Sequence, residues 1–316
     1  MNGRVVPPAS MVGSVLLAIA GLVLATPARA GVSGTLSPVY GPPLTVQTSQ
    51  SNVGGSDSPY ALINENDQSQ LDAAYGYVSN GTLYLFFSGS LIFWVQLEGG
   101  IEHWQPLDVF IDCAPGGQHQ LLANNPVLDP QSYDPNKMAG LTFDAGFSPD
   151  YWLSLGGITT VFWPNIGAYF ASLPASGGGT GAFLGTTQPG PPGALSGGTN
   201  PYGIEVTLDD SNPFGLGNGC AAATTPAVQK GIEWAIPLAA IGNPSGCIQV
   251  TAFVPATQDH SMISNQVMSP IPPGTCSLMP AAAVDFSAIP GDQFFTICPP
   301  TPVLPTSWGR LKASYR

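Results

Sequence analysis

Three aspartates beside candidate strands have the chemistry to bind a hard cation. Asp112 ends an apolar run and precedes a loop rich in Asn, whereas Asp144 and Asp150 flank Gly146 in a second loop. Calcium takes about six to eight oxygen ligands, and these loops lack the ligand spacing of an EF-hand. Asp side chains also cap turns by bonding to their own main chain. We therefore predict a structural Ca²⁺ held by Asp112, Asp144 and Asp150, with turn capping as the alternative.

Several aromatic side chains could recognise a neutral polysaccharide. Their rings can stack on the apolar C–H faces of a sugar, while nearby amides and carboxylates accept its hydroxyl protons. Tyr151 and Trp152 follow an aspartate in an expected turn, and Trp104 lies in an expected loop. We predict that the ligand-binding residues are Trp104, Tyr151, Trp152 and Trp163. The alternative is that these rings belong to a hydrophobic core.

The sequence contains no strong catalytic motif. It has neither the Gly-x-Ser-x-Gly turn of α/β-hydrolases nor the His-Glu-x-x-His motif of zinc proteases. Glycoside hydrolysis needs two carboxylates across a cleft, and the candidates are Glu205, Glu233, Asp108 and Asp112. On strands, such residues are more often the outward polar half of an alternation. We therefore predict no catalytic residue, with a glycoside hydrolase as the less favoured alternative.

The composition favours a turn-rich β protein. Among 316 residues there are 39 Gly and 33 Pro, only 8% are charged, and 44% are hydrophobic. A coiled coil or long-helix bundle needs more charged residues and fewer helix breakers, and a disordered chain has fewer apolar ones. These proportions predict a folded all-β chain.

Residues 1–30 have the pattern of a secretory signal peptide. Arg4 precedes an uncharged, mostly apolar stretch over 11–26, and Ala28-Arg29-Ala30 matches a cleavage site. The stretch is shorter than the roughly 20 residues that a membrane-spanning helix needs, and an uncleaved anchor is the alternative. We predict a secreted protein of the extracellular space, cell surface or periplasm, without an integral membrane segment after cleavage.

The charge of the remaining chain limits its partners. Removal of 1–30 leaves 5 of the 7 basic residues and all 19 acidic ones, a net charge of −14. Nucleic acids and anionic membranes need clustered basic residues, so they are excluded as partners of the body of the protein. Neutral polysaccharides, cell-surface glycans and divalent cations are compatible.

Five cysteines follow residue 30, and export permits disulfides. Cys113 lies within an apolar run, which favours a free, buried thiol. The remaining cysteines would then pair and tie the C-terminal loops, in an arrangement that the sequence leaves open: Cys220, Cys247, Cys276 and Cys298. The chain has no Cys-x-x-Cys pair, which disfavours zinc and thiol redox sites.

Asn80-Gly81 is the clearest local signal. Asn-Gly favours a two-residue type I′ hairpin loop because both positions need a positive φ, and it separates 74–79 from 82–87. Further strands are predicted at 91–97, 107–113, 157–163, 204–208, 231–236, 247–254 and 293–298. Pro237 favours a helical turn over 237–241, and Ser148 could cap another over 148–152.

Three segments form a recognisable series: the hairpin ending at 83–89, the Phe110-Ile111-Asp112 strand and the late 231–238 segment with Glu233. In this order they resemble the DOMON-like superfamily, which includes the family-9 carbohydrate-binding modules. The resemblance covers roughly 60–298. It implies a jelly-roll-like sandwich of two antiparallel sheets, and it implies sugar binding, often with structural calcium, or haem binding through Met and His. Haem is not expected here.

The predicted organisation is a single sandwich domain over 31–298 with long Gly/Pro-rich loops. Residues 174–201 are expected to be a flexible loop, and a second Pro-rich loop spans 270–280. The Pro-rich composition of residues 299–305 predicts a stiff polyproline spacer. It leads to a tail whose last seven residues contain Arg310, Lys312 and Arg316. We expect this tail to dock to an export or surface component, with a frayed terminus as the alternative.

Overall fold

The computed structural model divides the chain into two units, residues 1–30 and residues 31–316. It describes 31–51, 69–91, 105–128, 134–160, 163–212, 219–224, 228–257 and 259–299. The side chains of 158–160, 163, 164 and 279 are not included. The predicted signal peptide, the predicted C-terminal tail and most of the predicted strand over 91–97 therefore lie outside the described residues.

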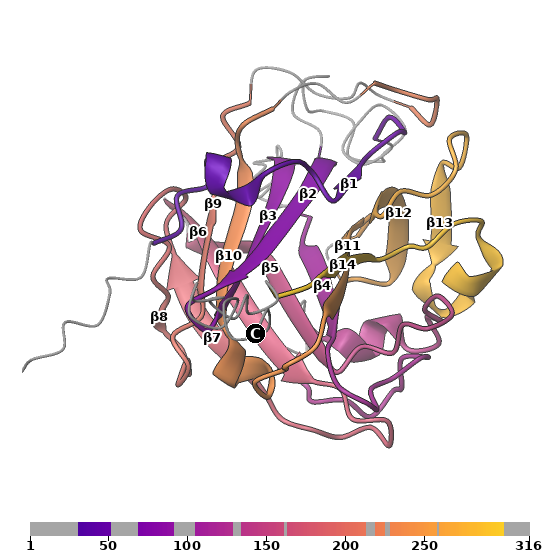
Figure 1. The fold of residues 1–316 in the computed structure, drawn as a ribbon. Helices are drawn as coiled ribbons and strands as arrows, with labels where there is room; N and C mark the ends of the chain where they lie inside the picture. The colour runs from indigo at the N-terminus through magenta and orange to yellow at the C-terminus, as the bar shows by residue number, and fades with distance from the viewer. Residues whose placement is uncertain are drawn as a thin grey trace, which may run out of the picture. The chain divides into compact units, whose positions relative to one another are not determined.

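Two antiparallel sheets pack as a sandwich, which confirms the predicted all-β fold class (Figure 1). The first sheet has the order β1-β2-β3-β10-β9, with bounds β1 Thr45–Val46, β2 Gln70–Ser79, β3 Thr82–Ser90, β10 Gly231–Pro237 and β9 Glu205–Leu208. The second has the order β13-β12-β11-β4-β5-β6-β7-β8, and β14 also pairs with β11. Its bounds are β13 Ser277–Pro280, β12 Met262–Met268, β11 Ile248–Pro255, β4 Leu107–Asp112, β5 Tyr151–Thr160, β6 Trp163–Ser172, β7 Gly181–Thr187, β8 Ser196–Gly197 and β14 Phe295–Ile297.

Helical structure in the described residues is limited to five short 3-10 turns: η1 Pro38–Tyr40, η2 Pro135–Met138, η3 Leu238–Ile241, η4 Ala281–Ala283 and η5 Phe286–Ala288. The predicted turn over 237–241 corresponds to η3, which ends at Gly242 with a left-handed φ of 77°. No helix in the described part of the chain is long and apolar enough to cross a membrane.

The predicted hairpin is confirmed. Ser79 pairs with Thr82, and Asn80 and Gly81 have φ values of 49° and 72°. Both positive values fit the type I′ loop that Asn-Gly favours.

Both faces of each sheet are covered by apolar side chains. Along β4, Val109 and Ile111 enter the core between the two sheets, whereas Phe110 belongs to a second core on the opposite face. Loop residues such as Phe143 and Phe147 close this second core. A third cluster covers the outer face of the first sheet and includes Tyr75, Tyr84 and Phe86.

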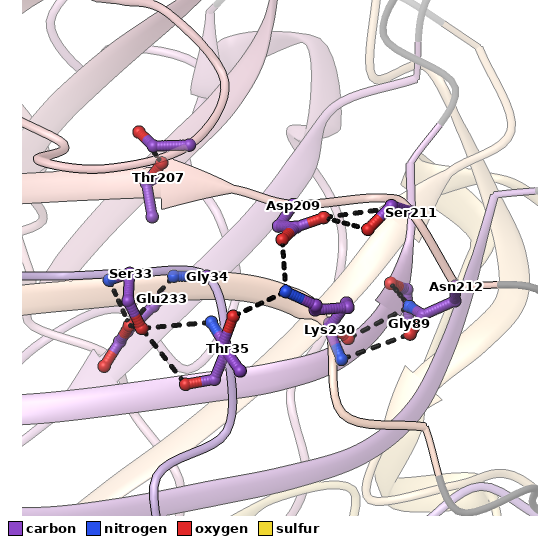
Figure 2. A network of polar contacts seen from close by, with 11 residues as sticks. Ser33, Gly34, Thr35, Gly89, Thr207, Asp209, Ser211, Asn212, Lys230 and Glu233 are labelled. Carbon is purple, nitrogen blue, oxygen red and sulfur yellow. Dashed lines mark hydrogen bonds and ion pairs between the residues drawn. The ribbon is translucent and has the colours of Figure 1, made fainter.

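The N-terminal segment 31–46 is anchored over that third cluster by polar bonds (Figure 2). Glu233 of β10 accepts hydrogen bonds from the main-chain N–H groups of Ser33 and Gly34, at 2.6 and 3.0 Å. Next to it, Lys230 donates to Thr35 Oγ1 at 2.8 Å and forms an ion pair with Asp209 at 2.7 Å. These bonds tie the start of the described chain to β9 and β10.

Two disulfides cross-link the C-terminal half of the chain. Cys220 pairs with Cys276 and Cys247 with Cys298, and Cys113 is free and half-buried. The expectation of one free thiol and four paired cysteines is thus confirmed. Two disulfides indicate that the protein folds in an oxidising compartment.

Two local predictions were wrong. Residues 148–152 do not start a helix, because Tyr151 pairs with Ile111 and begins β5. Residues 174–201, expected to be a flexible loop, contain β7 and β8. Gly185 of β7 has a local reason to be glycine, since a Cβ there would lie 2.5 Å from the main-chain oxygen of Ser196. The glycine allows close strand approach rather than disorder.

Candidate functional site

The pairing of β4 with β5 brings three of the predicted site residues together. Ile111 pairs with Tyr151, and the N–H of Asp150 donates to the carbonyl of Ile111 at 2.8 Å. Asp112 directly follows Ile111, and Asp150 directly precedes Tyr151. The two carboxylates and the Tyr151 ring therefore lie at the same end of this strand pair.

Both carboxylates bond to main-chain N–H groups. Asp150 Oδ2 accepts from Cys113 and Ala114 at 2.9 and 2.8 Å, and Asp112 Oδ2 accepts from Ser148 at 2.7 Å. Burial raises the pKa of Asp112, the N–H of Ser148 lowers it in part, and the nearby Asp150 carboxylate raises it further. These contacts brace the loops on either side, as the turn-capping alternative expects.

Asp144 is engaged elsewhere. Its Oδ1 accepts from the N–H of Ala145 at 2.7 Å and its Oδ2 from the N–H of Gln293 at 2.9 Å. Within the described ranges, no three His, Cys, Asp or Glu side chains are grouped so that they could hold a metal ion. This finding does not decide on calcium, because Ca²⁺ also takes main-chain and amide oxygens.

Trp152 is a core residue and not a surface ring. It is 0% exposed, and its Nε1–H donates to Asp108 Oδ1 at 2.9 Å. In the conformation described, its indole offers no face to a saccharide. Trp104 and the side chain of Trp163 lie outside the described residues, so both remain predictions.

A half-exposed aromatic cluster surrounds Tyr151. The Tyr151 ring stacks on Phe170, with centroids 5.6 Å apart and planes at 26°. Burial raises the pKa of Tyr151, and smaller contributions come from Cys113, Asp150 and Tyr202. We call Tyr151, Phe170 and Tyr202 the tyrosine rim.

Tyr202 contributes most of the exposed ring surface of the rim. It is 51% exposed and lies in the turn 200–203, where the N–H of Gly203 donates to the carbonyl of Asn200 at 3.2 Å. The Asn200 side chain fixes this turn by donating to the carbonyl of Ile204 at 2.8 Å and accepting from its N–H at 2.9 Å. Sequence reasoning missed Tyr202, although Asn-Pro-Tyr-Gly is a recognisable turn signal.

The rim combines apolar ring faces with carboxylate acceptors, and it lacks an activated nucleophile. Cys113 is the thiol at this place, and burial, followed by Asp150 and Asp112, raises its pKa to about 12. Such a thiol stays protonated and unreactive at neutral pH. The arrangement suits hydrogen bonding and stacking better than bond cleavage.

A buried Asp–His pair lies in the second core. Asp108 Oδ2 is 2.7 Å from His260 Nδ1, and both side chains are 0% exposed. Since the Asp108 carboxylate also accepts from Trp152, it links three core side chains from β4, β5 and the β11–β12 loop. Without exposed surface, this pair has the character of a core-bracing contact.

Comparison of the chain with protein-family models, with curated proteins and with solved structures gave no match. The resemblance to the DOMON-like superfamily therefore remains a prediction, based on the three segments quoted above.

Proposed function

We propose that the protein is a secreted, non-catalytic binding protein for neutral polysaccharide, acting at the cell surface or in the extracellular matrix. The observation that carries this proposal is the tyrosine rim, an exposed and a half-buried tyrosine beside two carboxylates. Rings of this kind stack on sugar C–H faces, and carboxylates accept sugar hydroxyl protons. The acidic composition and the signal-peptide pattern support an exported protein with uncharged partners.

Glycan-array screening followed by titration of the best neutral glycan tests the proposal. Tyr202→Ala and Tyr151→Ala should each weaken binding about fivefold, since a stacked ring contributes on the order of 1 kcal/mol. Val39→Ala is the matched control, because Val39 is an exposed apolar residue in the N-terminal segment. Absence of any glycan ligand, or equal losses in all three variants, would contradict the proposal.

A structural surface or matrix protein without a small ligand is the second candidate. The burial of Trp152 and the main-chain bonds of Asp112, Asp144 and Asp150 favour it. It predicts that no glycan binds while the fold stays intact. Glycoside hydrolysis is the less favoured third candidate.

Calcium binding is a separate proposal for the same strand end. Asp112 and Asp150 lie close enough for Asp150 to raise the pKa of Asp112, and a divalent cation would relieve this repulsion. If Ca²⁺ is bound there, a chelator should lower the melting temperature of the wild type and not that of Asp112→Asn. An unchanged wild-type melting temperature would contradict it.

A further inference from the structure

Asp72 is a buried carboxyl without a hydrogen-bond partner in the described part of the chain. Leu71 pairs with Gly89 and Ala73 with Ser88, so Asp72 is the extra residue of a β-bulge near the start of β2. Its side chain is 0% exposed, and neither carboxylate oxygen has a hydrogen-bond partner among the residues described. A buried charge of this kind is very costly unless it is paired or neutralised.

The bulge lies where the two sheets are joined by polar side chains. Gln47 Nε2 donates to the carbonyl of Val267 in β12 at 3.3 Å, and the N–H of Leu71 donates to Gln266 Oε1 at 3.0 Å. The N–H of Gln47 in turn donates to the carbonyl of Asp72 at 2.7 Å. The main chain of Asp72 is therefore directly linked to both residues that make the inter-sheet contacts, to Gln47 by a hydrogen bond and to Leu71 by the peptide bond. We call this region, residues 47–51, 69–72 and 264–267, the polar corner.

Among the described residues, no Lys or Arg side chain pairs with Asp72. The described residues contain two basic side chains, Lys137, which is exposed, and Lys230, which pairs with Asp209. The elements packed on β2 bring only phenols: Tyr40 of η1, Tyr84 of β3, and Tyr75 and Tyr77 of β2 itself. β1, β11, β12 and β14 contain no titratable side chain. Burial raises the pKa of Asp72 to about 7. The pKa of Tyr75 is also raised, first by its own burial and then by the nearby Asp72 carboxylate.

We propose that Asp72 makes the polar corner pH-responsive: the protonated carboxyl keeps the two sheets joined, and its ionisation above neutral pH loosens the corner. The sign follows from proton linkage. The folded-state pKa of about 7 lies above the ordinary aspartate value of 3.8, so the folded chain binds the extra proton. This contribution to stability is complete below about pH 4 and is lost as the pH rises through about 7.

Equilibrium unfolding in urea from pH 5 to pH 8.5 tests the pH response of the polar corner in the full chain with its disulfides intact. Asp72→Asn keeps the shape of the side chain and removes its titration. Between pH 5 and pH 8.5, the folding equilibrium constant of the wild type should fall at least about tenfold relative to that of this variant. A pKa difference of about three units sets the upper limit of this change at about 1,000-fold. Asp285→Asn, at an exposed turn aspartate, is the matched control and should follow the wild type.

Hydrogen exchange on the wild type alone gives a second measurement, which does not depend on the variant folding. Amides of 47–51 and 69–72 should lose protection above pH 7 relative to the central β10 amides, after correction for intrinsic exchange. A constant ratio between wild type and Asp72→Asn across the pH range, or unchanged relative protection, would overturn the proposal. So would restoration of wild-type stability at pH 8.5 by Ca²⁺ alone, since the corner would then be a cation site.

Discussion

Removing the Glu233 carboxylate should detach the N-terminal segment from the first sheet. Glu233 is 6% exposed. Its Oε2 accepts from the N–H groups of Ser33 and Gly34, and its Oε1 accepts from the Tyr40 hydroxyl at 2.9 Å (Figure 2 shows the Ser33 and Gly34 side of this network). Burial and then the nearby Glu233 raise the pKa of Tyr40, so its hydroxyl stays protonated and donating.

The magnitude follows from these donors. The Ser33 hydroxyl also donates to Glu233 Oε2, at 3.2 Å, which makes four donors. A hydrogen bond to a charged acceptor contributes about 1.5–3 kcal/mol, so four of them give an upper limit of about 6–12 kcal/mol. The segment near Ser33 is only partly buried, and its N–H groups regain water when it separates from the sheet. We therefore expect Glu233→Ala to lower the free energy of unfolding by about 2–4 kcal/mol, and Tyr40→Phe by about 1–2 kcal/mol.

Urea unfolding at pH 7 with intact disulfides measures both values, and hydrogen exchange localises the effect to 33–40. Ser37→Ala is the control in the same segment. Its hydroxyl caps η1 by accepting an exposed 3.5 Å hydrogen bond from the N–H of Val39, so the change should be about 0.5–1 kcal/mol, well below the loss in Glu233→Ala. If Glu233→Ala costs no more than Ser37→Ala, or leaves protection of 33–40 unchanged, the anchoring role is refuted.

Three further outcomes are expected. Cys220→Ser with Cys276→Ser opens a loop with a sequence separation of 56 and should cost up to about 4 kcal/mol in calorimetric or urea unfolding; no loss would mean that the bridge constrains little. Burial opposes ionisation of Asp209, but hydrogen bonds from Lys230 and Ser211 lower its pKa overall. The ion pair therefore adds stability above the ordinary Asp pKa that is lost as the pH falls, and Lys230→Met should flatten the acid side of the stability curve. Deletion of 306–316 should reduce surface retention without lowering the melting temperature, and unchanged retention would refute a docking tail.

The strands that were predicted are those whose signal is local. Asn80-Gly81 specifies its loop through backbone φ alone, and Gly231–Pro237 carries apolar, β-branched and aromatic residues that suit a strand in any context. β12 and β7 were missed for a different reason. β12 contains Ser264, Asn265 and Gln266, which are buried because they bond to the other sheet and to the neighbouring strands. Ser264 bonds to Val254 of the neighbouring strand, whereas the partners of Asn265 and Gln266, Gln50 and Leu71, are 215 and 195 residues away. Burial of this kind leaves no periodic pattern in the sequence.

The candidate site shows the same limit. Asp112, Asp150 and Tyr151 were singled out one by one, but their proximity follows from the register of β4 against β5. The sequence predicts Tyr151 and Trp152 in a turn after Asp150, whereas both lie in β5, where alternation places the two rings on opposite faces of the sheet. Tyr202 is added by a turn some fifty residues further along the chain, and short-range patterns cannot join it to Tyr151.

The covering of both faces of each sheet determines where a ligand could bind. Loops 114–150 and 270–290 contribute to the second core, and the N-terminal segment covers the third cluster. In the described part of the chain, these segments cover much of the outer sheet faces, whereas β7, β8 and the turns at the strand ends keep exposed residues. The tyrosine rim lies at such an end, with Tyr202 on a turn fixed by Asn200. A substitution in the sheet faces, such as Phe110→Ala, should then reduce stability by about 3–5 kcal/mol and leave glycan affinity of the folded fraction unchanged. A selective loss of affinity in that variant would place the binding surface on a sheet face and contradict the assignment to the rim.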